Sequence, residues 1–163
     1  VLALNIWTSR IQERPDTARV PEPAPTQATP PVPEQRRQML METAADLTKA
    51  EWAAGNVKEA AGVSGDVVWS DAEQAGYMRF RGLPANDPKR ETYQLWIFDE
   101  TQDEKTPIDG GTFNVNDNGE VVIPIDARLA ARNPKMFAVT VEKPGGVVVS
   151  KREKIVAIAK TET

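Results

Sequence analysis

Acidic side chains are the groups of this sequence whose type and spacing could most readily perform chemistry. One polar segment carries five of them: Asp99, Glu100, Asp103, Glu104 and Asp109. Two carboxylates held about 5 to 9.5 Å apart can act as acid and base, or as acid and nucleophile, in glycoside hydrolysis. These five are interspersed with Lys105 and Thr106, and no Trp-lined cleft is implied beside them, so we interpret the segment as a solvated loop. A hydrolase that uses Asp103 is the enzymatic alternative.

The segment Asn114-x-Asn116-x-Asn118-Gly119 is similar to the start of a calcium-binding loop. That loop requires an acidic first residue and a Glu at the twelfth position, which here is Ile125. Asn and Gly also accept the positive φ angles of a tight turn. We therefore predict a hairpin turn at residues 116–119 rather than a metal site.

Four large aromatic residues could build a binding platform: Trp52, Trp69, Trp96 and Tyr93. Large aromatic side chains of a small β domain usually lie in its core, where the indole N–H finds a partner. We predict a core role and keep one alternative function, a β-sandwich module that recognises carbohydrate or cell-envelope material through these residues. Arg79 and Arg81 could likewise hold an anion, but pairing with carboxylates across the strands is the simpler interpretation.

The sequence contains no Cys and no His. Disulfides, thiolate nucleophiles and Ser-His-Asp triads are therefore excluded. The net charge is −4, and Lys and Arg are mixed with Asp and Glu, so no basic face for nucleic acid is expected. We predict that the chain is not an enzyme and that it uses no cofactor and no metal.

The elements that would position these residues are organised around the stretch 92–99. Its residues favour strands, and large apolar groups fall on both faces, which is typical of a central strand. Short strands at regular intervals around it indicate a sandwich or barrel. The predicted strands are 51–54, 65–70, 76–83, 92–98, 112–115, 119–125, 136–142, 147–149 and 155–159, with one or two helical turns at 126–132. The predicted fold is all-β: an antiparallel, two-layer, immunoglobulin-like β-sandwich over residues 50–163.

The residues before the sandwich have a different composition. Seven prolines between Pro15 and Pro33 indicate an extended linker. Residues 34–49 read as a helix. Residues 1–7 are apolar and end in Trp7. They are either the last turns of a membrane span or a segment that packs on a folded domain. We assign residues 1–33 to a juxtamembrane remnant and linker.

Four short motifs occur in a fixed order along the predicted sandwich: Gly82-Leu83-Pro84, Tyr93-Gln94-Leu95-Trp96, Gly111-x-Phe113, and a final stretch with Thr140, Glu142, Gly145 and Gly146. Their order and spacing over residues 50–160 resemble the C-terminal domain of the anti-sigma-K factor (RskA-like) family. The family's pattern is G-L-P, Y-Q-L-W, G-x-F and A-V-T-x-E-x-x-G-G. The chain departs from the family after Gly146, where residues 147–150 replace a Pro-containing run.

The resemblance implies a regulatory role without catalysis, in controlling sigma-factor-dependent transcription. It implies a bacterial inner-membrane protein with a single span, whose domain seen here lies on the extracytoplasmic (periplasmic) side. The resemblance implies three partners. The first is a sigma factor, bound by a cytoplasmic part absent from this chain. The second is the membrane, reached through an upstream span absent or truncated here, and the third is a regulatory protease. The resemblance also favours a membrane remnant for residues 1–7.

Overall fold

The computed structural model describes residues 29–116 and 119–162. Within them, one helix, α1 (Pro33–Thr43), precedes a set of strands and one 3-10 turn, η1 (Lys58–Ala60). The strands are β1 (Leu47–Glu51), β2 (Ala53–Ala54), β3 (Ser64–Ser70), β4 (Ala75–Arg81), β5 (Thr92–Phe98), β6 (Ile108–Phe113), β7 (Val121–Pro124), β8 (Met136–Glu142) and β9 (Ile155–Lys160).

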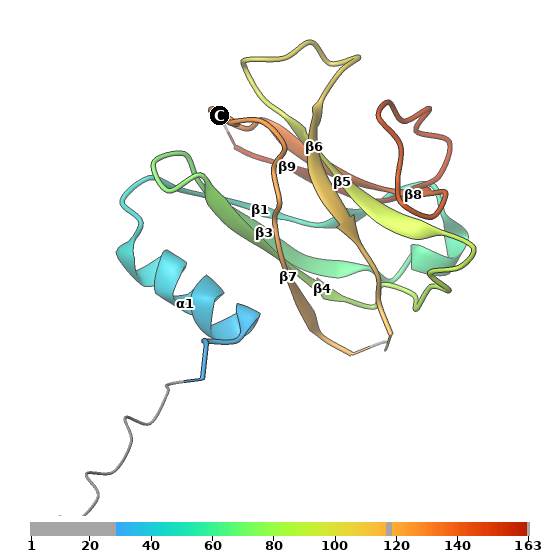
Figure 1. The fold of residues 1–163 in the computed structure, drawn as a ribbon, viewed down its shortest axis with the longest axis horizontal. Helices are drawn as coiled ribbons and strands as arrows, with labels where there is room; N and C mark the ends of the chain where they lie inside the picture. Colours follow the sequence, from blue (N-terminus) through green and yellow to red (C-terminus); the bar gives the residue numbers. More distant parts are fainter. Residues whose placement is uncertain (1–28, 117–118, 163) are drawn as a thin grey trace, which may run out of the picture. The chain divides into compact units, whose positions relative to one another are not determined.

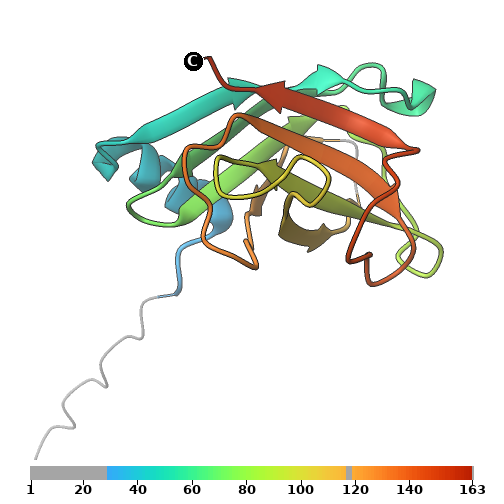
Figure 2. The ribbon, with the colours of Figure 1, turned by 90° about the horizontal axis from the view of Figure 1, so that it is seen from above.

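The strands form two antiparallel sheets that face each other across one core (Figures 1 and 2). The strand orders are β1-β3-β4-β7 and β2-β9-β8-β5-β6. The first strands, β1 and β2, follow each other directly in the chain but belong to different sheets, so the chain changes sheet at Trp52. The predicted all-β, two-layer sandwich is confirmed.

Strand β5 lies inside the five-stranded sheet, between β8 and β6, and all seven of its residues are buried. Tyr93, Leu95 and Ile97 belong to the main core between the sheets. Trp96 and Phe98 point the other way, into a smaller cluster with Ala138 on the outer face of the sheet. The period of two expected of a strand thus buries both faces, which confirms the central-strand prediction.

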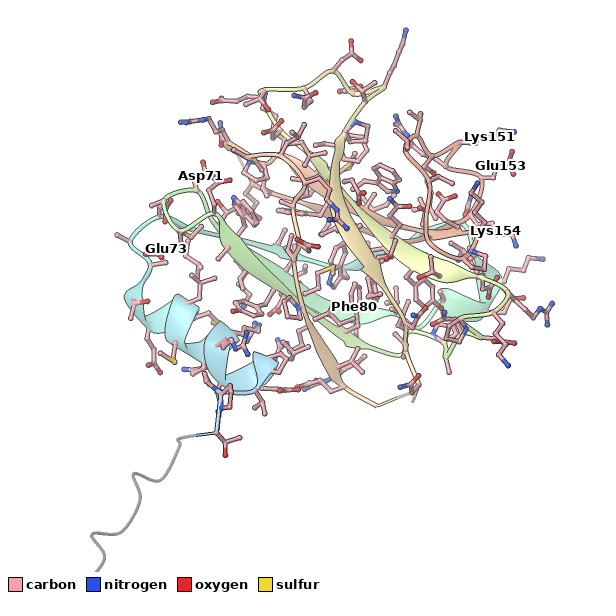
Figure 3. The ribbon with its side chains drawn as sticks, viewed as in Figure 1. Asp71, Glu73, Phe80, Lys151, Glu153 and Lys154 are labelled. Carbon is pink, nitrogen blue, oxygen red and sulfur yellow. The ribbon has the colours of Figure 1, made fainter. Side chains whose placement is uncertain are left out.

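Stacked aromatic rings connect the two sheets in the core. Trp52 lies with its ring centroid 4.8 Å from that of Phe80, and Phe80 lies 5.9 Å from Phe113. Phe113 in turn contacts Tyr93 at 5.5 Å. Phe80 marks the centre of the sandwich in Figure 3. Since each ring removes a large apolar area from water, this column of rings contributes much of the free energy of folding.

The predicted helix over 34–49 was too long. Helix α1 ends at Thr43, and residues 47–51 form β1, which pairs with β3 from Leu47 opposite Ser70. The carboxylate of Asp46 fixes the change of direction by accepting hydrogen bonds from the Ser70 hydroxyl at 2.6 Å and the Ala72 N–H at 2.7 Å. These two bonds also lower the pKa of Asp46 below its usual value. Tertiary pairing therefore overrides the local helical preference.

The predicted hairpin between 112–115 and 119–125 was also wrong. Strand β6 pairs with β5, whereas β7 pairs with β4 in the other sheet, so the connection between them crosses the sandwich. The residues of the expected turn at 117–118 lie outside the described part of the chain. An Asn- and Gly-rich sequence signals a change of direction, but it does not specify that the two flanking strands pair.

Two further local predictions failed beyond β7. Residues 126–132 form no helical turn, because their N–H groups find partners elsewhere in the fold. Asp126 and Arg128 donate to the carbonyls of Gly110 and Asp109 in β6, and Ala131 and Arg132 donate to the side chains of Gln74 and Asp99. Residues 147–149 form no strand either. Strand β8 already has β5 and β9 as its two neighbours, so no edge is free for a third partner.

Candidate functional site

The residues of the four motifs fall into two groups on either face of the five-stranded sheet. One group points into the core or closes its end, and the other lies on the outer face. The inner group is Gly82, Leu83, Pro84, Tyr93, Leu95 and Phe113; the outer group is Gln94, Trp96, Thr140, Glu142, Gly145 and Gly146. Gly111, in β6 near the register shift opposite β5, has a φ of +96°.

The inner group fastens the turn after β4 to the core. The hydroxyl of Tyr93 donates a hydrogen bond to the carbonyl of Pro84 at 2.7 Å, and Leu83 is fully buried. Gly82 has a φ of +72°, and a Cβ there would lie 2.6 Å from the carbonyl oxygen of Gly62. Burial of the phenol, and secondarily the negative charge of Glu91, raises the pKa of Tyr93 to about 12.

The outer group holds the loop between β8 and β9, residues 143–154, which we call the β8–β9 loop. A directional chain of hydrogen bonds leads from the sheet into this loop. The indole N–H of Trp96 donates to Oγ1 of Thr140 at 2.9 Å, and the Thr140 hydroxyl donates to Oε1 of Glu142 at 2.7 Å. The Ser150 hydroxyl donates to the same oxygen of Glu142, and Ser150 Oγ accepts the N–H of Arg152 at 2.9 Å.

A second anchor lies at the start of the loop. The side-chain amide of Gln94, which is buried, donates through Nε2 to the carbonyl of Val147 and accepts from its N–H, both at 2.9 Å. Gly146 precedes this contact with a φ of +78°, and a Cβ there would lie 2.7 Å from Cγ2 of Thr112 and 2.8 Å from Oε1 of Gln94. Only glycine fits this turn without displacing the Gln94 anchor.

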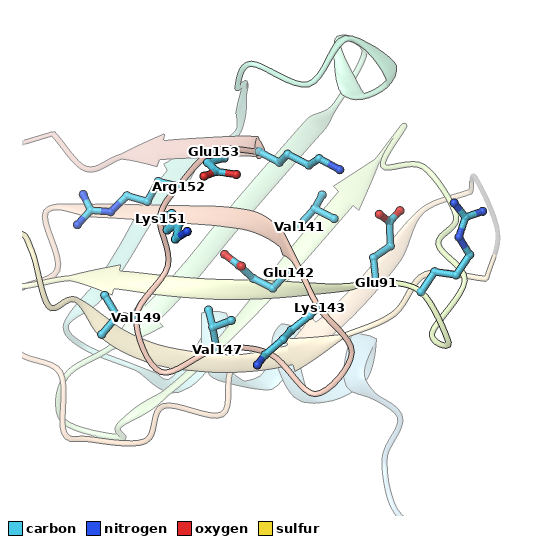
Figure 4. Close-up of a pocket in the computed structure, with 11 residues that line it drawn as sticks. Glu91, Val141, Glu142, Lys143, Val147, Val149, Lys151, Arg152 and Glu153 are labelled. Carbon is cyan, nitrogen blue, oxygen red and sulfur yellow. The ribbon is translucent and has the colours of Figure 1, made fainter.

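Between the β8–β9 loop and β8 lies an open cleft of about 330 Å³ (Figure 4). Its lining mixes charges of both signs: the acidic residues are Glu91, Glu142 and Glu153, and the basic ones are Arg90, Lys143, Lys151, Arg152 and Lys154. Glu142 already accepts two hydrogen bonds from the loop and β8, so its carboxylate serves to hold the loop. The motif residues therefore build and brace a loop, and they present no pair of groups arranged for acid–base chemistry.

Comparison with known families confirms the expected family. The family model described as "Anti-sigma-K factor rskA, C-terminal" matches residues 1–150. The chain belongs to this family. The match begins at residue 1, before the residue 50 expected from the motifs, and ends at residue 150 rather than at 160. No curated protein and no solved structure matches the chain.

In this RskA-type C-terminal domain, the aspartates of the acidic segment accept hydrogen bonds from backbone N–H groups. Asp99 accepts hydrogen bonds from the N–H groups of Thr101 and Arg132, and Asp109 accepts the N–H of Gly111 at 2.8 Å. Asp103 accepts the N–H of Lys105 at 2.8 Å. No group of three or more acidic side chains that could hold a metal ion occurs in the described residues. Residues 100–106 are exposed, as the solvated-loop interpretation expects, whereas Asp99 is buried and Asp109 belongs to β6, so the predicted loop was too long at both ends.

The aromatic platform is not formed. The four residues proposed for it are all buried: Trp52, Trp69, Trp96 and Tyr93. The indole N–H of Trp52 donates to the carbonyl of Asp66, and that of Trp69 donates to the carboxylate of Asp71. The predicted core role of these residues is confirmed, and the ligand-binding alternative loses the surface on which it depended.

The sequence reasoning missed an ion cluster around Asp66 of β3. This carboxylate is only 2% exposed, and its two oxygens lie 2.7 Å from Nη2 of Arg37 and 2.7 Å from Nη2 of Arg79. Lys49 adds a third cation at 3.5 Å. The expected cross-strand pairing of Arg79 is thus correct, and Arg81 pairs with Glu120 in the same way. Asp66 could have been found only by aligning β3 with β4, where it lies opposite Arg79.

The same cluster attaches helix α1 to the four-stranded sheet. Only Arg37 and Leu40 of the helix are buried, and Nη2 of Arg37 donates a hydrogen bond to Oδ1 of Asp66 in β3. Arg37 and Leu40 are thus the two buried anchors of helix α1, and Pro33 and Met41 are half-buried. No helix in the described residues is long and apolar enough to cross a membrane.

Proposed function

We propose that this chain is the extracytoplasmic regulatory domain of a membrane-anchored anti-sigma factor. In this proposal the folded sandwich controls how a protease reaches the Pro-rich segment before α1. The observation that carries the proposal is the family match over residues 1–150. It is supported by the site, whose motif residues brace a loop and a turn and form no reactive arrangement.

The proposed route from the domain to the tether is helix α1. The helix begins at Pro33, the last proline of the Pro-rich segment. A protease needs an extended chain without backbone hydrogen bonds, which a Pro-rich sequence favours, whereas core strands open only at a free-energy cost near that of global unfolding. Any event that loosens α1 lengthens the accessible segment towards β1.

The ion pair between Arg37 and Asp66 is suited to such a release. Buried ion pairs contribute little net stability, because desolvation of the charges offsets their attraction. Removing one partner is strongly unfavourable, because the other charge then stays buried without compensation. A ligand or partner that competes for Arg37 or Asp66 would therefore detach α1 without unfolding the sandwich.

Limited proteolysis with a non-specific protease tests the physical half of this proposal. The residues from Pro31 onward form one compact unit, so the first cuts in the wild-type chain should leave a stable fragment that begins close to Pro31. Asp66→Asn should add cuts within residues 33–46, while Asp103→Asn, an isosteric change in the exposed loop, should not. First cuts at 99–107 with the tether intact would contradict it.

The regulatory half needs a cellular measurement. In the membrane-anchored protein that carries this domain, Asp66→Asn should raise a sigma-factor-dependent reporter without an inducing signal, and Asp103→Asn should leave it unchanged. An unchanged reporter, in cells where α1 of the Asp66→Asn protein is demonstrably cleaved, would refute control through the helix.

A further inference from the structure

We propose that the β8–β9 loop, together with Leu129, is a docking surface for an anionic phospholipid membrane. It would place apolar side chains in the bilayer interface and lysines at the level of the headgroups. The inference goes beyond the proposed function, because it requires neither a sigma factor nor a protease.

The first observation is a cluster of exposed apolar side chains. Val148 is 92% exposed, Val149 is 59% exposed and Leu129 is 56% exposed. In the described part of the chain, only Val32 and Met39 are comparable large hydrophobic residues on the surface. Val148, Val149 and Leu129 all line one groove of about 260 Å³. The buried residues Trp96 and Ile108 line the same groove. Exposed apolar groups that gather in this way mark an interaction surface, whereas single ones need no explanation.

The second observation is the charge of the loop. Residues 143–154 contain Lys143, Lys151, Arg152 and Lys154 against Glu153, a net charge of 4 − 1 = +3, in a chain whose net charge is −4. Lys143, Lys151 and Lys154 form no ion pair with any described residue. Figure 3 shows Lys151 and Lys154 at the periphery of the loop. The neighbouring segment 99–104 carries four carboxylates, so the positive charge is local to the loop.

The third observation is that the loop is held in the exposed conformation. Gln94 binds the backbone of Val147, which precedes the exposed valines 148 and 149, and Glu142 binds the hydroxyl of Ser150, which follows them. Arg152 adds a contact over the ring of Phe98, with its guanidinium carbon 5.2 Å from the ring centroid. Val148 therefore stands between two anchors and does not fold back onto the sheet. A surface fixed in advance loses little conformational entropy on binding.

The order of these side chains along the loop favours a lipid surface over a protein partner. One lysine precedes the valines, and two lysines and an arginine follow them. The exposed valines at the tip of the loop would contact the acyl chains, and the cations before and after them in the sequence would contact the anionic headgroups. Lys105, which lines the same groove, extends the positive rim, and Arg128 lines it too, with its guanidinium 3.6 Å from the carboxylate of Asp126. Asp109 also lines it, with its carboxylate engaged by the N–H of Gly111.

Vesicle cosedimentation of the 163-residue chain tests the proposal. The chain should bind vesicles of phosphatidylglycerol and phosphatidylcholine, bind pure phosphatidylcholine vesicles much more weakly, and dissociate as salt rises. Val148→Asp and Lys151→Glu should each weaken binding at least about tenfold. The matched controls are Val32→Asp and Lys89→Glu, which change exposed residues of the same types elsewhere and should bind as the wild type does. Val148→Asp, Lys151→Glu and Lys89→Glu should keep the wild-type melting temperature, and Val32→Asp, which places a carboxylate at the N-cap of α1, should not lower it.

The arms of the experiment separate the alternatives. Inorganic phosphate at constant ionic strength should not compete with the vesicles; competition would assign the loop to free phosphate and overturn the lipid proposal. Vesicle binding that persists in both Val148→Asp and Lys151→Glu would place the contact outside the loop and overturn it as well. Absence of wild-type binding to the anionic vesicles would also reject the proposal, without any bearing on sigma-factor control.

Discussion

Nη2 of Arg37 lies 2.7 Å from Oδ1 of Asp66, and both side chains are almost completely buried. This contact joins helix α1 to the middle of the four-stranded sheet. It is the one ion pair of the described residues in which both partners are withdrawn from water, since Lys49 and Arg79 keep substantial exposure. It makes the attachment of the helix sensitive to charge rather than to apolar area alone.

The first prediction concerns this carboxylate. Asp66→Asn should lower the free energy of unfolding by about 3 kcal/mol, because Arg37 is left with its charge buried and unpaired. Asp103→Asn should stay within about 0.5 kcal/mol of the wild type, as expected for an exposed loop position. Urea denaturation followed by tryptophan fluorescence measures both. Equal losses in the two variants would show that the ion cluster does not fasten the helix.

The second prediction concerns Trp96, whose side chain is 2% exposed on the outer face of β5. Trp96→Ala should lower the free energy of unfolding by about 3 to 5 kcal/mol, since it leaves a cavity and removes the donor to Thr140. Trp96→Phe should cost less, because much of the buried area is kept. Asp103→Ala, within about 0.5 kcal/mol, is the reference. If the Trp96→Ala and Asp103→Ala proteins have the same free energy of unfolding, β5 is not the central strand of the fold.

The third prediction separates local from global stability at the β8–β9 loop. Gln94→Leu has a similar volume but loses both hydrogen bonds to Val147, which should cost about 1 to 3 kcal/mol. Hydrogen exchange at the Val147 amide should accelerate much more than exchange in β3 or β4. Thr112→Val, a change on the neighbouring strand, is the control. Uniform acceleration over all strands would mean that Gln94 supports the whole sandwich rather than the loop.

The fourth prediction follows from the raised pKa of Tyr93. The phenol should ionise with a pKa of about 12 in the folded protein, against 10.0 for the free group, so the neutral form is favoured by folding. Its contribution to stability is complete below pH 10 and is lost as the pH rises through about 12.

Alkaline titration of tyrosinate absorbance tests this assignment. Tyr93→Phe should remove the high-pH step while keeping the ring contact with Phe113, and Tyr77→Phe should leave that step in place. A Tyr93 phenol that ionises at its ordinary value in the folded chain would show that it is exposed to water.

The sequence alone was sufficient for the strands whose residues repeat with a period of two. Strand β5 was predictable because its side chains are apolar on both faces, and in β4 the inward positions of Met78 and Phe80 followed from simple alternation. The family was also recognisable from four short motifs, and the family match confirmed it. These features are local: a strand's own side chains determine its faces, and a motif is defined by neighbours in the chain.

Contacts between distant residues decided the rest. The sheet to which β7 belongs depends on an edge of β4, more than 40 residues earlier in the chain, and the end of α1 depends on Asp46 meeting Ser70. Residues 147–149 read as a strand, yet both neighbours of β8 were already taken, so the valines remain in a loop fixed by Gln94. Asp66 becomes the centre of an ion cluster only when α1, β1 and β4 converge on it. Local composition sets which residues can form a strand, whereas free edges and partner charges elsewhere in the fold decide which of them do.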